Sequence, residues 1–205
     1  MTRYVLGIDL GTSALKVALV SMAGEVVAAE QETCTVTLLP GGGAEQDPRR
    51  WWEQVTTASS RLMARAAVPA RSVAAVACTA QWSGTVPVDE QLQPVRPALI
   101  WMDSRGAPYV RRITSGAVRV RGYGAVKLAR WLRTTAGIPA QSGKDPVAHI
   151  LWLKHEEPET YRRGAAVPGT QGLAERLPHR AGGGVIRLDR AALGDRQPPP
   201  GPHPL

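Results

Sequence analysis

The sequence predicts an α/β fold, because apolar strand-like segments flank a segment that has the start and stop signals of a helix. Three segments rich in Val, Leu and Ile open the chain and are predicted strands, at residues 3–8, 15–21 and 25–34. The pair Asp47-Pro48 then starts a predicted helix, and the apolar segment Val73–Thr79 follows it as another strand. This order of elements is typical of an α/β domain.

The first predicted helix has the clearest boundaries. The pair Asp47-Pro48 supplies a cap residue and a proline at the first helical position. The helix should run to about Ala66, and the tryptophans at 51–52 should serve in packing. The strand at Val73–Thr79 is apolar almost throughout, which predicts a fully buried, central strand of a parallel or mixed sheet.

Beyond residue 80, the sequence predicts shorter strands and two more helices. A short strand is expected at Thr85–Val88, and Leu99–Arg105 begins as a strand and ends in polar residues. Helices are expected at residues 124–136 and 145–156, the second opened by Asp145-Pro146 in the same way as the first.

Composition restricts the partners and the compartment. The 205-residue chain carries a formal net charge of +8, and the stretch from Arg105 to Arg133 holds eight basic residues and no acidic one. A charge run on an amphipathic helix is usually a solvated face, and no nucleic-acid motif accompanies it, so we expect no nucleic-acid partner. No signal segment and no apolar run of about 20 residues is present, which predicts no membrane partner. Cys34 and Cys78 lie in predicted strands and fit buried, reduced thiols, so the expected localisation is cytoplasmic.

Residues suited to phosphate chemistry lie at the end of the first strand. Asp9 precedes a tight turn through Gly11, Thr12 and Ser13, here named the phosphate turn, and Lys16 lies in the next strand. Gly11 lets the backbone approach an anion, N–H groups in such a turn form an anion nest, and the two hydroxyls add donors. Lys16 offers a positive charge to phosphate oxygens, and Asp9 is a hard oxygen ligand for Mg²⁺. An ordinary hairpin turn is the alternative.

Four motifs together resemble those of the FGGY family of carbohydrate kinases. In chain order they are Asp9-Leu10-Gly11-Thr12, Glu45-Gln46-Asp47-Pro48-Arg49-Arg50-Trp51-Trp52, Gln81-Trp82-Ser83-Gly84 and Trp101-Met102-Asp103-Ser104-Arg105. The resemblance covers roughly residues 3–167. It implies the ribonuclease-H-like fold of actin and the heat-shock ATPases, with transfer of the γ-phosphoryl group of ATP to a sugar or polyol hydroxyl. The implied cofactors are ATP and Mg, and the likeness to the xylulokinase-like branch favours a xylulose-like substrate.

The resemblance also implies roles for individual residues of the phosphate turn. The matched Asp9, Gly11, Thr12 and Ser13 would cradle the nucleotide phosphates, and Asp9 would face Mg²⁺ directly or through water. Lys16 falls where relatives carry a basic residue.

The motif Gln81, Trp82, Ser83 and Gly84, here named the sugar loop, matches the loop that contacts the sugar in the family. Relatives of the xylulokinase type often have Met-His-Gly there. Trp82-Ser83 departs from that pattern, so the identity of the sugar stays open.

A second implied sugar segment follows the pattern Trp-x-Asp-x-Arg. Asp103 and Arg105 match it, and Asp103 would accept hydrogen bonds from substrate hydroxyls; a helix cap is the alternative for Asp103. We expect Trp101 in the core rather than as a platform for the sugar. His149 and His155 have helical spacing and no companion ligands, so they are predicted to be structural or surface residues.

The resemblance implies that two parts of a kinase lie beyond this sequence. Relatives supply the general base as a later Asp, and they carry a second domain of the same fold that binds adenosine. We therefore expect residues 1–167 to form a partial N-terminal domain that is inactive alone. The alternative is a non-catalytic sugar- or partner-binding fragment that complements a separate C-terminal half, and a dimer is also open.

From Pro168 the composition shifts to Gly, Pro and Arg. Residues 168–205 lack the apolar content that repays the entropy of ordering, so this tail is predicted to be disordered. A shift of reading frame is the favoured origin of the tail, and a natural low-complexity segment is the alternative.

Overall fold

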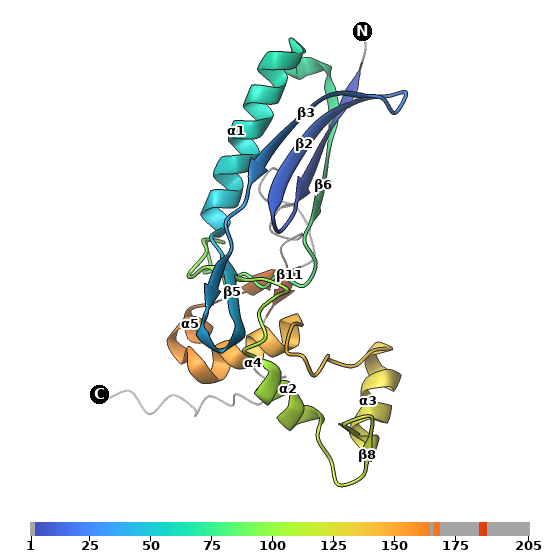
Figure 1. Ribbon diagram of the computed structural model, residues 1–205, viewed down its shortest axis with the longest axis vertical. Coiled ribbons are helices and arrows are strands. Elements are labelled where there is room, and N and C mark those ends of the chain that lie inside the picture. Colours follow the sequence, from blue (N-terminus) through green and yellow to red (C-terminus); the bar gives the residue numbers. More distant parts are fainter. Residues whose placement is uncertain (1–2, 165, 169–184, 188–205) are drawn as a thin grey trace, which may run out of the picture.

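The computed structural model describes residues 3–164, 166–168 and 185–187, and it has the predicted α/β fold. Its main sheet has four strands in the order β3-β2-β1-β6 (Figure 1). These are β1 (Tyr4–Leu10), β2 (Ala14–Ser21), β3 (Val26–Thr33) and β6 (Val73–Ala80). The first three are antiparallel neighbours, whereas β1 and β6 run parallel. The four strands predicted for this sheet are thus confirmed along the chain, with ends displaced by a residue or two.

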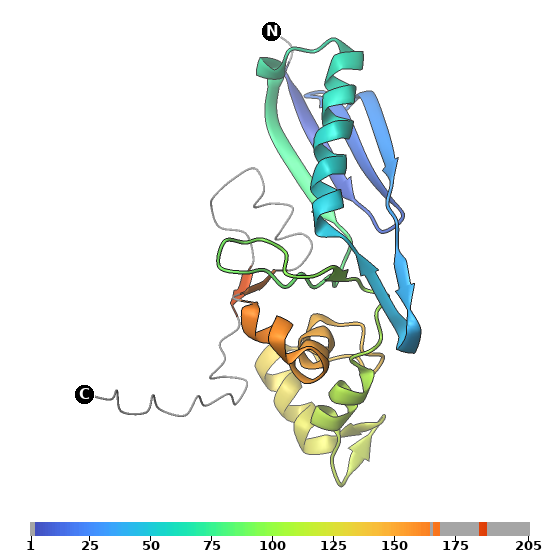
Figure 2. The same ribbon diagram turned by 90° about the vertical axis from the view of Figure 1, so that its left-hand side faces the viewer.

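Helix α1 (Pro48–Ala66) lies along one face of this sheet (Figure 2). The Asp47 side chain accepts a hydrogen bond from the Arg49 N–H at 2.9 Å, which confirms the predicted cap. Trp51 and Leu62 of α1 are buried in one apolar cluster with Leu15 and other residues of β1 and β2. The main core therefore lies between α1 and the sheet. The neighbour of Trp51, Trp52, is 38% exposed, so only one of the two tryptophans is core.

Strand β6 differs from its prediction. It is the outermost strand of the main sheet in the described residues, and most of its side chains are exposed, Val76 by 49%. The prediction of a fully buried, central strand is therefore wrong for this structure. The physical reason is that α1 covers only one face of the sheet and no described strand lies beyond β6.

Neither cysteine forms a disulfide bond. Cys78 lies in β6 and is partly buried, while Cys34 lies one residue beyond β3 and is buried. Burial raises the pKa of the Cys34 thiol. The expectation of reduced cysteines agrees with this geometry, although Cys34 is outside the strand that was predicted to contain it.

The other half of the molecule contains a small sheet and four helices (Figures 1 and 2). The sheet has the order β4-β5-β7, formed by β4 (Thr37–Leu39), β5 (Gly43–Gln46) and β7 (Ala98–Leu99). The helices are α2 (Ala107–Thr114), α3 (Ala125–Thr135), α4 (Pro146–Glu156) and α5 (Pro158–Arg163). Short elements complete this half: a 3₁₀ turn at Pro40–Gly42 and the hairpin of β8 (Arg119–Val120) and β9 (Tyr123–Gly124). A second 3₁₀ turn, Ala70–Ser72, connects α1 to β6.

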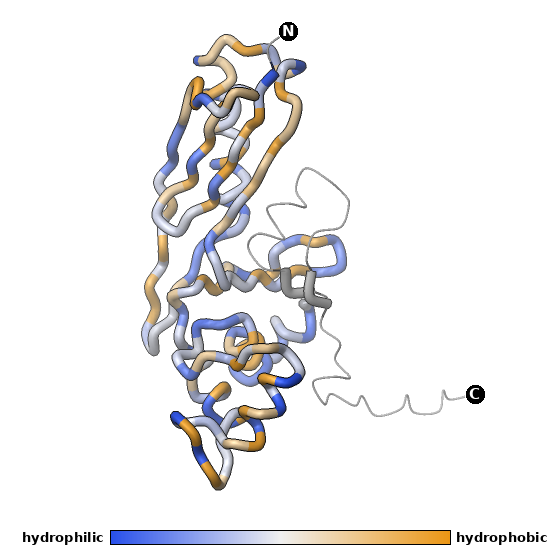
Figure 3. The backbone as a smooth tube through the Cα atoms, turned by 90° about the vertical axis from the view of Figure 1, so that its right-hand side faces the viewer, coloured by the Kyte–Doolittle hydropathy of each residue, from blue (hydrophilic) through white to orange (hydrophobic). Residues whose placement is uncertain are grey.

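The predicted helices at 124–136 and 145–156 are confirmed as α3 and α4. The predicted strand at Thr85–Val88 is reduced to two isolated bridges, one of which joins Thr85 to Leu99. Hydrophobic and hydrophilic residues are interspersed along the backbone (Figure 3), and no helix within the described residues is long and apolar enough to cross a membrane.

The predicted tail falls largely outside the described residues. Within them, β10 (Ala166–Pro168) pairs with β11 (Val185–Arg187) as a small antiparallel sheet. The proposed boundary at residue 168 and the disorder of the tail stay predictions.

Candidate functional site

The phosphate turn and the sugar loop lie side by side because their strands are neighbours. The phosphate turn follows β1 and the sugar loop follows β6, and the parallel register sets Leu10 opposite Ala80. The Gln81 N–H continues this pairing by donating to the Leu10 carbonyl at 2.8 Å. In open α/β sheets, the carboxyl ends of parallel strands are where ligands bind. The two segments that the sequence separated by about seventy residues therefore form one candidate site.

Glycine is required in the phosphate turn by the turn itself. The Gly11 N–H donates to the Ala14 carbonyl at 3.1 Å, and a Cβ on Gly11 would lie 2.7 Å from the same carbonyl oxygen. Any other residue would force this tight turn open.

Asp9 and Lys16 are brought together as cross-strand partners of β1 and β2. The Lys16 Nζ lies 3.9 Å from the Asp9 Oδ2, and the side chains are 61% and 45% exposed, respectively. No group of three or more His, Cys, Asp or Glu side chains in the described part of the chain forms a metal cage. Mg²⁺ is commonly held by one or two carboxylates together with substrate phosphates and waters. One accessible carboxylate beside a phosphate turn fits that donor set.

The Thr12 side chain is engaged on two sides. Its Oγ1 lies 3.0 Å from the Gln81 Oε1 and 2.9 Å from the Trp101 Nε1. Gln46, which the sequence placed in a family motif without a role of its own, donates from Nε2 to the Thr12 carbonyl at 2.9 Å, and it accepts from the Gln81 Nε2 at 2.7 Å. Trp101 is 40% exposed, so the expectation that it belongs to the core is wrong: its position is fixed by the hydrogen bond from its indole.

The sugar loop forms one wall of a pocket of about 700 Å³. The end of α3 and the start of α4 form the other walls, so the pocket combines elements far apart in the sequence. The residues lining it are Ala80, Gln81, Trp82, Ser83, Gly84, Trp131, Thr135, Gly137, Ile138, Pro139, Ala140, Asp145, Pro146 and Val147. Two indole rings and a carboxylate suit a polyhydroxylated ligand, which has apolar C–H faces and hydroxyl donors.

Within the sugar loop, Ser83 has a φ of 56°, a left-handed conformation that a residue with a Cβ seldom adopts. Such backbone strain clusters at functional sites. Trp82 next to it is 78% exposed, which leaves its ring free of the core. Sequence reasoning missed Trp131 and Asp145 of this pocket, since no motif links either residue to the sugar loop.

Asp103 and Arg105 belong to a buried cluster of charges rather than to the pocket lining. The Asp103 side chain is fully buried, and its Oδ2 accepts from the Ala44 N–H at 3.0 Å and from the Arg105 guanidinium at 2.6 Å. Arg105 also pairs with Glu45 and stacks 3.9 Å from the ring centre of Trp152. Burial alone would lower the pKa of Arg105, but its hydrogen bonds to Asp103 and Glu45 outweigh burial and raise it.

This cluster fixes the segment that follows β7. The helix-cap alternative for Asp103 is wrong, because α2 begins at Ala107 with Gly106 as its N-cap. Since protein donors occupy both carboxylate oxygens of Asp103, contact between this residue and a sugar hydroxyl stays a prediction.

His149 is fully buried behind Asp103, as expected of a structural histidine. Its Nε2 lies 3.3 Å from the Asp103 carbonyl oxygen, which can only accept, so the proton of the neutral ring is on Nε2. Its Nδ1 then accepts from the Thr85 hydroxyl at 2.9 Å. Burial lowers the pKa of His149 in spite of the nearby Asp103 carboxylate. His155 lies on the surface side of α4, stacked on Tyr109 with ring centres 4.8 Å apart.

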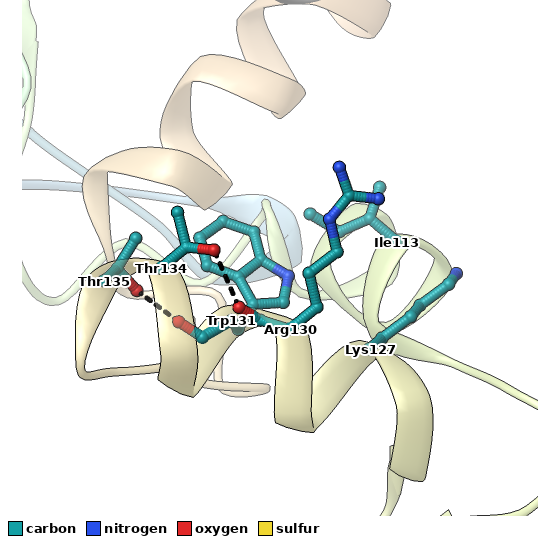
Figure 4. A pocket seen from close by; sticks show the side chains of 6 residues that line it. All are labelled: Ile113, Lys127, Arg130, Trp131, Thr134 and Thr135. Atoms are coloured by element: carbon teal, nitrogen blue, oxygen red, sulfur yellow. Dashed lines mark hydrogen bonds between the residues drawn. The ribbon is translucent and has the colours of Figure 1, made fainter.

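A second pocket, of about 390 Å³, lies along α3 (Figure 4). Lys127 and Arg130 supply its charge, and Ile113 of α2 closes one side. The hydroxyls of Thr134 and Thr135 are turned to carbonyls of their own helix, those of Arg130 and Trp131. They are thus poorly placed to bind a ligand, and the pocket near the sugar loop is the better candidate.

The fold is that of a carbohydrate kinase N-terminal domain. Residues 4–172 match the FGGY family of carbohydrate kinases, N-terminal domain, and the chain belongs to that family. The resemblance seen in the four motifs is therefore confirmed.

Curated relatives agree with this assignment. The chain is 36% identical to the xylulose kinase of Streptomyces coelicolor over 176 residues, which is 85% of this chain and 32% of that protein. It is 30% identical to the xylulose kinase of Bacillus subtilis over 163 residues, 80% of this chain and 30% of that protein. The chain thus spans about a third of the length of the curated relatives it matches.

Solved structures confirm the fold. A crystal structure described as a xyloylose kinase from Brucella ovis superposes with a TM-score of 0.73 at 22% identity, over 84% of this chain and 34% of that one. The ligand-bound xylulose kinase of Lactobacillus acidophilus gives a TM-score of 0.70 at 22% identity, over 87% of this chain and 33% of that one.

Proposed function

We propose that this chain supplies the phosphate-binding and sugar-binding loops of an ATP-dependent kinase for a xylulose-like sugar. The observation that carries the proposal is the meeting of the phosphate turn and the sugar loop at the ends of β1 and β6, beside a pocket of about 700 Å³. The similarity to xylulose kinases supports this class of substrate. Localisation in the cytoplasm is part of the same proposal.

Phosphoryl transfer depends mainly on positioning and on stabilisation of charge, and each loop has side chains for one of these tasks. Mg–ATP would supply the phosphoryl group and the metal charge. Asp9 would hold the metal, Lys16 would offset phosphate charge, and Ser13 with the backbone N–H groups of the turn would bind phosphate oxygens. Trp82 and Asp145 would orient the sugar.

Binding measurements on the full chain test the proposal. Isothermal titration calorimetry should detect D-xylulose and Mg–ATP. Trp82→Ala should weaken D-xylulose binding about tenfold or more, whereas Trp52→Ala, at a partly exposed tryptophan of α1 that does not line the pocket, should leave it unchanged. Asp9→Asn should weaken Mg–ATP binding, and Asp89→Asn, in an exposed turn, should not. Equal effects of each variant and its control, or no binding of either ligand, would contradict the proposal.

A second candidate is a non-catalytic fragment that complements a separate C-terminal half. One observation favours it: β6 is the outermost strand of the main sheet in the described residues, and it carries no charged side chain. Kinase assays test this candidate by complementation. Turnover of D-xylulose should appear when a separate polypeptide that supplies the remainder of an FGGY kinase is mixed with the chain, and no turnover in that mixture would contradict the candidate.

A further inference from the structure

A closed ring of hydrogen bonds joins the phosphate turn to the sugar loop. Thr12 bonds through its hydroxyl to Gln81, Gln81 bonds through its amide to Gln46, and Gln46 bonds back to the Thr12 carbonyl, at 3.0, 2.7 and 2.9 Å. Trp101 adds a fourth bond by donating its indole N–H to the Thr12 hydroxyl at 2.9 Å. Gln46 ends β5 and Trp101 follows β7, so the ring also ties the small sheet to the main one.

The direction of every bond in this ring is determined by its two ends. The Thr12 carbonyl can only accept, so the NH₂ group of Gln46 faces it, and the Gln46 Oε1 is left to accept from the NH₂ group of Gln81. The Gln81 Oε1 therefore faces the Thr12 hydroxyl, which donates to it and accepts from the Trp101 indole N–H. Reversing either amide would oppose two donors or two acceptors. The ring consequently forms or opens as a unit.

Burial makes the link strong. Gln46 is 2% exposed and Gln81 is 9% exposed, so water cannot readily replace a lost partner. The Thr12 hydroxyl can donate only one hydrogen bond. A phosphate oxygen that accepts this bond would therefore replace the Oε1 of Gln81, the first residue of the sugar loop, as its acceptor.

We propose that Gln46 and Trp101 are positioning residues that hold the phosphate turn and the sugar loop in register, so that a change in one loop is transmitted to the other. The functional meaning of this link rests on the proposed function, but its existence can be tested without a ligand.

The test measures hydrogen exchange by NMR in the full chain, at the amides of Gly11 in one loop and Gln81 in the other. Gln46→Leu removes two bonds of the ring without altering either loop, and exchange at both amides should rise about tenfold. The matched control is Gln54→Leu, which removes a 2.8 Å bond to the Thr33 carbonyl outside the ring and should leave both amides unchanged.

Two further variants separate the ring from general loosening of the fold. Thr12→Val should raise exchange at Gln81 and shift the indole N–H signal of Trp101, and Thr12→Ser, which keeps the hydroxyl, should restore both. Trp101→Phe removes the indole donor and keeps an aromatic ring at a partly exposed position, so it provides the test if Gln46→Leu does not fold.

Unchanged exchange at either amide in Gln46→Leu, or an equal rise in Gln54→Leu, would overturn the proposed link. Calorimetry with D-xylulose and Mg–ATP then separates this result from the proposed function. If the exchange data support the link but the chain binds neither ligand, the proposed function is contradicted and the link stands. If the chain binds both ligands but the exchange data show no link, the proposed function stands and the link is contradicted.

Discussion

Replacing Asp103 with Asn should destabilise the fold by about 3 kcal/mol. The carboxylate lies in a cluster of two cations, Arg96 and Arg105, and three anions, Asp103, Glu45 and Glu157. All of these side chains are between 0 and 12% exposed except Glu157, which is 31% exposed at the rim of the cluster. Asparagine keeps the shape of the side chain but removes the fully buried anion that lies 2.6 Å from the Arg105 guanidinium, where water can hardly replace it. Breaking a buried pair costs about 3–5 kcal/mol, and the lower value applies because Glu45 still pairs with Arg105.

The assay is urea unfolding followed by circular dichroism, with the slope of the transition expected to stay constant. Glu159→Gln is the control, since its ion pair with Arg162 lies between exposed side chains of α5 and surface pairs contribute little. A loss of less than about 1 kcal/mol for Asp103→Asn would refute the reasoning, because it would mean that the cluster is solvated or rearranges without cost.

Three other predictions concern the histidine, the core and the cap. Burial lowers the pKa of His149, so the unfolded chain binds a proton below about pH 6.5 while the folded chain does not. Stability should therefore fall as the pH drops from 7 towards the folded-state pKa, by up to about 1.4 kcal/mol per pH unit. In melting curves against pH, His149→Gln should lose this slope and His155→Gln should keep it. Leu62 is fully buried, so Leu62→Ala should lower the free energy of unfolding, measured in urea, by about 3 kcal/mol. A loss below about 1 kcal/mol would mean that Leu62 is not part of the core. Asp47→Ala should cost about 1 kcal/mol by the same measurement, and no loss would mean that the cap bond does not stabilise α1.

The elements that were predicted correctly are those whose signals are local. Strands β1 to β3 follow from apolar segments separated by turns, and α1 follows from Asp47-Pro48 at its start. Strand β6 was placed correctly along the chain but not in the sheet. Its apolar sequence indicates burial on both sides, and no local pattern tells which elements provide that burial.

Within the candidate site, the sequence predicted only contacts between residues that are close along the chain. Asp9 and Lys16 meet across a hairpin, a contact that the turn itself dictates. Gln46 carries no such signal, because its partners Thr12 and Gln81 lie 34 and 35 residues away and meet it only through the pairing of sheets. Trp101 was expected in the core on its apolar character, whereas its indole N–H determines where it lies.

The two outer strands of the main sheet differ in charge, and this difference determines at which edge a further strand could pair. At β3, Glu30 and Glu32 form ion pairs with Arg61 of α1, and charged side chains at an edge discourage another strand from pairing there. At β6, the run from Val73 to Ala80 carries no charge. A strand added to this sheet would therefore join beside β6 and not beside β3. Val76→Lys would place a charge on the permissive side and should keep a concentrated solution of the chain monomeric.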